Sequence, residues 1–259
     1  MNLESIFDKL EIEKGDKIIV TSNIIKILTK YKKKKINFNP NILIDKLIKK
    51  IGKTGTLLIP TFNWDFCKGE TFDYYRTSSQ SGALGNIALK RKDFLRSLNP
   101  IYSFAVTGKD KKKICHLKHL NCFSLNSPFG YLIKKGGKNL FIDINRRTGD
   151  ETKLGGFTFH HVVEQAVKVP YRYFKIFKGN YINKKKIKKT IKVKFYARNL
   201  ESKYKVFISK KLDQELLKRN ILKREEINGI NLDLIRLKNT FKILTKDLKT
   251  KKNFFVKKY

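Results

Sequence analysis

Short apolar runs and amphipathic stretches alternate along the first two thirds of the chain. The apolar runs are short, rich in β-branched residues and bounded by turn residues, which predicts buried strands over 15–24, 55–62, 101–108 and 139–145. The stretches between and after them have helical spacing and predict helices over 39–52, 81–92, 109–120 and 157–167. This alternation predicts an α/β fold, a three-layer α/β/α sandwich with a mixed, largely parallel central sheet.

One helix carries clear signals at both ends. Asn39 is a good N-cap, Pro40 suits the first helical position, and Gly52 suits the end of the helix.

The pattern changes after Pro170. Strand-like runs then mix with Lys-rich connections and two late helical stretches. We expect an α+β portion from about residue 170, packed on the same core within a single domain spanning 1–259. No linker and no internal repeat divides the chain.

The chain is strongly basic. Its 259 residues include 59 Lys and Arg against 22 Asp and Glu, a formal net charge of +37. Such a charge suggests a polyanionic partner. However, only ten of these residues are Arg, the side chain that nucleic-acid interfaces favour, and Lys is spread from end to end. This mix is typical of AT-biased coding, so we expect no nucleic-acid partner.

The alternative is a basic nucleic-acid-binding protein with no catalytic activity. Its binding would fall steeply with salt and would be indifferent to acetyl-CoA.

The cysteines and the apolar runs suggest a compartment. Three cysteines, at positions 67, 115 and 122, have no disulfide-framework spacing, which favours a reducing environment. The first residues do not form a signal peptide, and no apolar run approaches the ~20 residues that span a bilayer. We therefore expect a cytoplasmic protein with no membrane partner.

Two of the four histidines stand side by side in the stretch TFHHVVE. On a helix, His161 and Glu164 are neighbours on one face, and Thr158 extends the same polar stripe. A carboxylate beside an imidazole fixes its tautomer and raises its basicity, as in an oriented general base. The alternative is an ordinary His–Glu pair on a helix surface.

A second cluster has metal-ligand residue types. The stretch CHLKHLNC contains Cys115, His116, His119 and Cys122. On a helix His116 points away from the other three, so a tetrahedral set does not converge, and we expect no metal site.

Several stretches together resemble the aminoglycoside 3-N-acetyltransferase family, which is distinct from the GNAT acetyltransferases. In order along the chain they are GDKIIVTSNI, GTLLIPTFN, FDYYRTSSQSGALGN, RSLNPIYSFAVTG, SPFGYL and TFHHVVE, with VPYR following. Each fragment is weak alone, but their order and spacing cover nearly the whole chain.

The resemblance implies acetyl transfer from acetyl-CoA to an amine of an aminoglycoside or amino sugar. It places His161 at the family's catalytic histidine, with Glu164 and Thr158 in the same motif, and it requires no metal. By the same match, the residues near the CoA or the active cleft are Thr21, Ser22, Asn23, Arg96, Ser97, Ser103 and Ser127.

The sequence departs from the family at several positions. Thr21 and Asn99 stand where the family usually has His, and the stretch 145–156 differs from the family's connection. Acids that could bind a cationic acceptor are scarce, and the candidates near motif segments are Asp65, Glu70, Asp73, Asp143, Asp150 and Glu151. Because a field from +37 would repel a polycation, we expect a natural acceptor such as an amino sugar on a nucleotide or glycan.

The sequence leaves other properties open. It does not determine the acyl chain length, transfer to nitrogen or to oxygen, or the oligomeric state, with a homodimer among the alternatives.

Overall fold

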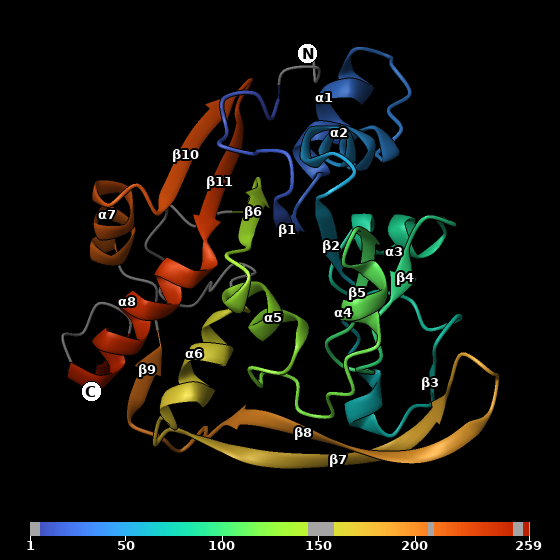
Figure 1. Cartoon of the computed structure of the whole chain (residues 1–259), viewed down its shortest axis with the longest axis vertical. Helices are drawn as coiled ribbons and strands as arrows, with labels where there is room; N and C mark the ends of the chain where they lie inside the picture. The colour runs from blue at the N-terminus through green and yellow to red at the C-terminus, as the bar shows by residue number, and fades with distance from the viewer. Residues whose placement is uncertain (1–5, 145–157, 207–209, 251–255, 259) are drawn as a thin grey trace.

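A computed structural model describes residues 6–144, 158–206, 210–250 and 256–258. Within them, a seven-stranded central sheet organises the molecule (Figure 1). In spatial order its strands are β10 (Leu222–Ile227), β11 (Ile230–Arg236), β6 (Lys138–Ile142), β1 (Lys17–Ser22), β2 (Thr56–Pro60), β5 (Phe104–Gly108) and β4 (Leu95–Arg96).

The strand directions confirm the mixed sheet and correct one part of the expectation. β1 runs parallel to both β2 and β6, so the centre of the sheet is parallel. The other four pairings are antiparallel, so the expectation of a largely parallel sheet is wrong. The error arises because β5 also reads as an apolar run, and such runs do not reveal strand direction.

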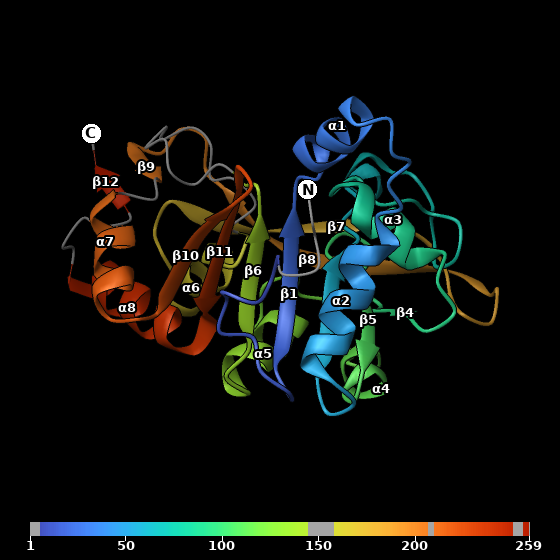
Figure 2. The same ribbon diagram turned by 90° about the horizontal axis from the view of Figure 1, so that it is seen from above.

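Helices cover both faces of the sheet, which confirms the three-layer architecture (Figure 2). Ile18 and Val20 of β1 pack in one core with α2, whereas Ile19 packs in the opposite core with α5 and α6. This alternation is the two-residue period of a strand with both faces buried. The helices are α1 (Ile25–Lys33), α2 (Asn41–Ile51), α3 (Ala83–Leu89), α4 (Lys111–Cys115), α5 (Pro128–Lys134), α6 (His160–Val167), α7 (Lys210–Lys218) and α8 (Leu237–Thr250).

The helix ends differ from the sequence prediction at several positions. α2 ends at Gly52 as expected, but its N-cap is Pro40, and the Asn39 side chain accepts a hydrogen bond from the Asn41 backbone. α4 ends at Cys115, five residues before the expected end of the helix over 109–120. The missed helix α5 begins with Pro128 after the N-cap Ser127, a pair that is itself a helix-start signal.

The C-terminal portion contributes to the central sheet and forms two smaller sheets. β11 pairs with β6, and α8 packs in the same core as α5 and α6. β7 (Arg172–Ile182) and β8 (Lys188–Arg198) form a long hairpin that pairs with β3 (Phe72–Asp73) and runs below the helices in Figure 1. β9 (Tyr204–Val206) pairs with β12 (Val256–Lys258).

In the described residues, no helix combines the length and the apolar composition that a membrane crossing requires.

The close contact between the end of β5 and the residue before β2 can be tested at Gly108, with Gly69 as the control. Gly108 has a φ of +98°, and a Cβ there would lie 2.2 Å from the Gly55 carbonyl oxygen. Gly69 has a φ of +96° but nothing within 4 Å of such a Cβ. We expect Gly69→Ala to cost about 1 kcal/mol of unfolding free energy through backbone strain alone. Gly108→Ala should cost about 1–3 kcal/mol more, because the clash adds overpacking.

Urea unfolding of both variants measures the difference. Equal losses of stability would contradict the close approach of Gly108 to Gly55.

Candidate active site

A cavity of about 340 Å³ opens at the carboxyl ends of β1 and β2. β1 lies between β2 and β6 in the sheet. The chain continues from β1 to β2 on one side and later forms β6 on the other side, so the cavity lies where the strand order reverses. This is the place at which open α/β sheets commonly bind ligands. Its lining residues are Ile19, Thr21, Ser22, Pro60, Phe62, Trp64, Ser81, Phe129, Asn139, Ile144, Thr158 and Phe159.

α6 begins at this cavity and carries the predicted histidine. Thr158 and Phe159 line the cavity immediately before the helix, and the His161 backbone N–H donates to the Thr158 carbonyl at 3.1 Å. The His161 side chain is 18% exposed and is not itself among the residues that line the cavity. Its ring packs against Phe123, with 4.8 Å between ring centroids.

The Glu164 carboxylate is fully buried and joins four side chains. Its Oε2 lies 3.1 Å from His161 Nδ1, 2.7 Å from Arg172 Nε and 3.8 Å from His160 Nε2. Its Oε1 accepts a 3.1 Å hydrogen bond from the Tyr171 hydroxyl. Because a carboxylate only accepts, Nδ1 of His161 carries the proton and the lone pair lies on Nε2.

The surroundings keep His161 uncharged, so the expectation that the neighbouring carboxylate raises the basicity of the ring is wrong. Burial, and next the positive charge of Arg172, hold the pKa of the His161 imidazole well below its usual value. The ring is therefore neutral at neutral pH, the state that a proton acceptor requires. Burial and the nearby Glu164 charge raise the pKa of the Tyr171 hydroxyl, so it stays a hydrogen-bond donor.

Three of the predicted site residues line the cavity. They are Thr158, Thr21 and Ser22, and Thr21 Oγ1 donates to Asn139 Oδ1 at 3.3 Å. Asn23 does not line it; its side-chain oxygen accepts from the Ile25 backbone N–H at 3.0 Å, at the start of α1.

The other four predicted cofactor residues are buried away from the cavity lining. Arg96 donates to Ser103 Oγ at 3.0 Å and to two backbone carbonyls, and burial lowers its pKa to about 10. Ser97 accepts from the Phe104 N–H, and Ser127 caps α5. Within this structure they hold loops and helix ends together, and a role in cofactor binding stays a prediction.

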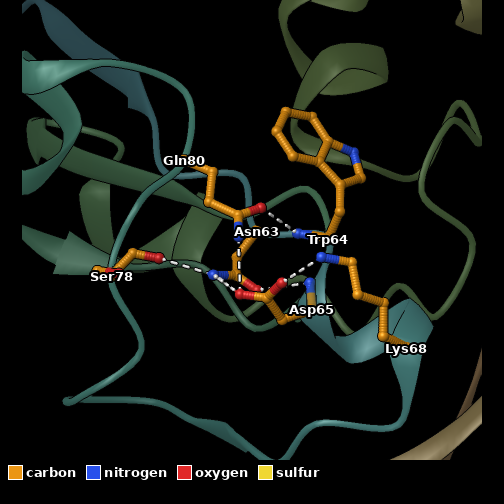
Figure 3. A network of polar contacts seen from close by, with 6 residues as sticks. All are labelled: Asn63, Trp64, Asp65, Lys68, Ser78 and Gln80. Atoms are coloured by element: carbon orange, nitrogen blue, oxygen red, sulfur yellow. Dashed lines mark hydrogen bonds and ion pairs between the residues drawn. The ribbon is translucent and has the colours of Figure 1, made fainter.

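None of the predicted acceptor-binding acids in the described residues lines the cavity. Asp65 follows the lining residue Trp64, and Asp143 pairs with Lys26 at 2.9 Å. Asp65 accepts from Lys68 at 3.0 Å and from Gln80 at 2.7 Å, while the Trp64 ring points away from this network (Figure 3). These hydrogen bonds, first the one from Lys68, lower the pKa of the Asp65 carboxyl. Asp73 accepts from two backbone N–H groups in a turn, and Glu70 lines a second cavity together with Asp65. The stretch 145–156 lies outside the described residues.

Two residues of the site, Arg172 and Tyr171, were not predicted from the sequence. Both follow α6 within the stretch VPYR, which carried only a similarity of position. A buried Glu needs a cation close by, and Arg172 follows α6 in the sequence, but the polar stripe that carries Glu164 gave no sign that this carboxylate is buried.

One group of possible metal ligands occurs in the described residues. His160, His161 and Glu164 offer ligand atoms within 4.8 Å of one another. However, the Arg172 guanidinium already lies 2.7 Å from the Glu164 oxygen that faces both histidines. A divalent cation there would have to displace this charge, so the set fits hydrogen bonding better than zinc coordination. The possible metal ligands within 115–122 do not form such a group in the described residues. The Cys115 thiol donates to the Leu95 carbonyl, and the Cys122 thiol donates to the Asn99 side chain.

Comparisons with known proteins agree with this architecture. The sequence matches the profile of the family described as aminoglycoside 3-N-acetyltransferase over residues 32–249. The chain is similar in fold to AAC-IIIb in a binary complex with CoASH (TM-score 0.73, 17% identity, 96% of this chain and 95% of that chain covered). It is also similar to sisomicin-bound AAC-VIa (TM-score 0.76, 15% identity, 96% and 97% covered).

A third similar structure is the YokD protein from Bacillus subtilis (TM-score 0.70, 18% identity, 94% of this chain and 96% of that chain covered). No curated protein matches the sequence directly.

The family profile spans most of the chain, and the fold agrees with it along nearly its whole length. The chain therefore belongs to the aminoglycoside 3-N-acetyltransferase family, a family of N-acetyltransferases.

A charge-removal pair tests the buried Glu164 cluster. Arg172→Met leaves a buried carboxylate without its cation, which we expect to cost about 3–5 kcal/mol of unfolding free energy. The double variant Glu164→Gln/Arg172→Met removes both charges and should recover at least half of that loss. Urea unfolding gives the three free energies; a loss in Arg172→Met below about 1 kcal/mol, as for an exposed pair, would contradict the cluster.

Proposed function

We propose that the chain transfers an acetyl group from acetyl-CoA to an amine of an aminoglycoside or amino sugar, with His161 as the general base. The observation that supports this most strongly is the buried Glu164, which orients Nδ1 of His161 and leaves Nε2 available, one helical turn from the cavity. Family membership supports the reaction class.

The proposed chemistry follows from the properties of the side chains. The acceptor nitrogen forms a bond to the thioester carbonyl carbon while His161 Nε2 takes a proton from that nitrogen. The tetrahedral intermediate then breaks its carbon–sulfur bond, and the proton on His161 passes to the CoA thiolate. The products are an N-acetylated acceptor and free CoA, so no oxidant and no metal is needed.

Residues at the cavity are proposed to stabilise the intermediate and to bind acetyl-CoA. Thr158, which lines the cavity beside α6, offers a hydroxyl to the oxyanion of the intermediate. Thr21 and Ser22 line the cavity at the end of β1, where the resemblance places the pantetheine arm of acetyl-CoA. Asn23 follows them at the start of α1.

Loss of the base tests the proposal directly. We expect His161→Gln to lower kcat by about 10²–10⁴-fold and to leave acetyl-CoA affinity largely unchanged, because the ring acts on the proton and not on cosubstrate binding. Product formation by mass spectrometry gives kcat, and calorimetry gives the affinity. The control is His116→Gln, an exposed ring outside the site.

Acetylation that is unaffected in His161→Gln would remove His161 from the mechanism. No acetyl-CoA binding by the wild type, together with steeply salt-dependent nucleic-acid binding, would favour the alternative function.

The pH profile provides a second test. The rate requires neutral His161, and because its pKa is lowered, the fall in kcat/KM that accompanies protonation of the ring should lie below pH 6.5, the usual pKa of a histidine. Arg172 disfavours the charged ring, so Arg172→Gln should raise this pKa and move the fall in kcat/KM to higher pH. Arg219→Gln, at an exposed position immediately after α7, is the matched control. An unchanged profile in Arg172→Gln, measured where the variant is folded, would contradict the electrostatic role of Arg172.

A further inference from the structure

A third cavity lies at the edge of the central sheet opposite the candidate active site. Its volume of about 370 Å³ is sufficient for a small ligand. Four of its eight lining residues are Lys, and we call it the basic cavity. The lining consists of Gly15, Lys17, Thr54, Lys109, Asp110, Lys113, Tyr131 and Lys135, all of them well inside the described range 6–144.

The basic cavity forms where β1 begins. Lys17 is the first residue of β1, whereas Thr21 and Ser22 at the other end of this strand line the active-site cavity. An extended strand rises about 3.3 Å per residue, so roughly 15 Å of β1 separates the two cavities. α4 and α5 contribute Lys113 and Tyr131 to the lining, and Figure 2 shows both helices toward the amino end of β1. The basic cavity is therefore separate from the proposed acetyl-transfer site.

Three of the four lysines have no acidic partner. Lys109, Lys113 and Lys135 form no ion pair with any described residue. Lys17 Nζ lies 3.8 Å from Oδ2 of Asp110, the one acid in this lining. Four Lys against one Asp give the lining a net charge of +3. Like charges gathered in a hollow concentrate the local field, which attracts an anion.

The surrounding structure positions these groups. The Lys109 backbone N–H donates to the Gly55 carbonyl at 2.9 Å, which holds the start of the α4 segment against the turn before β2. The Lys113 ammonium lies 5.6 Å from the centre of the Tyr131 ring. Burial, and next the Asp110 carboxylate, raise the pKa of the Tyr131 hydroxyl to about 12, so this hydroxyl stays protonated and can donate a hydrogen bond.

We propose that the basic cavity binds a compact anion with two linked phosphates, either free pyrophosphate or the diphosphate of a nucleotide. Lysine ammonium groups bind phosphate oxygens as point charges. Three ammonium groups without acidic partners favour an anion with several charges over a singly charged one. A nucleic acid would need a positive stripe that follows its backbone, whereas this hollow gathers its charges at one point. The inference does not depend on the proposed acetyl transfer.

Calorimetry with inorganic pyrophosphate at low salt tests the inference. We expect saturable binding at one site per chain. Lys113→Gln/Lys135→Gln should raise the Kd about tenfold or more, because two charge-assisted contacts are lost. The matched control is Lys32→Gln/Lys33→Gln, which removes the same charge from the exposed end of α1. It should raise the Kd less than about threefold, since only the distant field changes.

Other anions identify the ligand more closely. Sulfate should bind at least about tenfold more weakly than pyrophosphate, because it carries less charge. ADP carries the same linked phosphates as pyrophosphate. Tighter binding of ADP would assign the cavity to a nucleotide, and equal affinities would assign it to the free anion.

Several results would overturn the inference. Absence of saturable binding, equal losses in the two double variants, or equal affinity for sulfate would leave only the general field of a +37 chain. Loss of pyrophosphate binding when acetyl-CoA saturates the protein would place the anion at the cosubstrate site. Displacement of pyrophosphate by a single-stranded oligonucleotide of higher affinity would favour a nucleic-acid surface.

Discussion

The burial of Glu164 is the constraint on which the site depends. A carboxylate with no exposed surface is tolerated only where a cation and hydrogen-bond donors surround it, and here Arg172, Tyr171 and His161 do so. These partners come from α6 and from the chain that leads into β7, so the ion pair also fixes how the long hairpin begins. The contact with Glu164 determines the tautomer of His161, and burial together with the charge of Arg172 keeps its ring neutral. Stability and chemistry therefore rest on one buried cluster.

The fold places this cluster beside a cavity for general reasons. Parallel strands in the centre of a sheet end at the same edge, and the reversal of chain order beside β1 leaves a crevice there. α6 starts at that crevice, which brings Thr158 to the cavity and His161 one turn behind it. The relatives compared above share this fold at 15–18% identity, which shows how few side-chain identities the architecture itself requires.

The sequence predicted the core of the fold because its signals there are local. Strand runs such as 15–24 and the helix over 39–52 combine apolar periodicity with Pro and Gly boundaries, and both elements occur. Strand direction is not local: β5 and β11 run antiparallel to their neighbours although their apolar runs resemble those of β1. The residues around His161 also divide into local contacts, which the sequence predicts, and tertiary contacts, which it does not. Glu164 lies one helical turn away and was found by spacing, whereas Arg172 reaches it through tertiary packing and was missed.

The most direct test of the account is the protonation state of His161 in the folded protein. Nitrogen NMR of the imidazole ring, assigned with His161→Gln, reports which nitrogen carries the proton and how the ring titrates. We expect a neutral ring with the proton on Nδ1, and a ring that remains neutral well below the pH at which a free histidine takes up a proton. A ring protonated on Nε2, or an imidazolium at neutral pH, would contradict it.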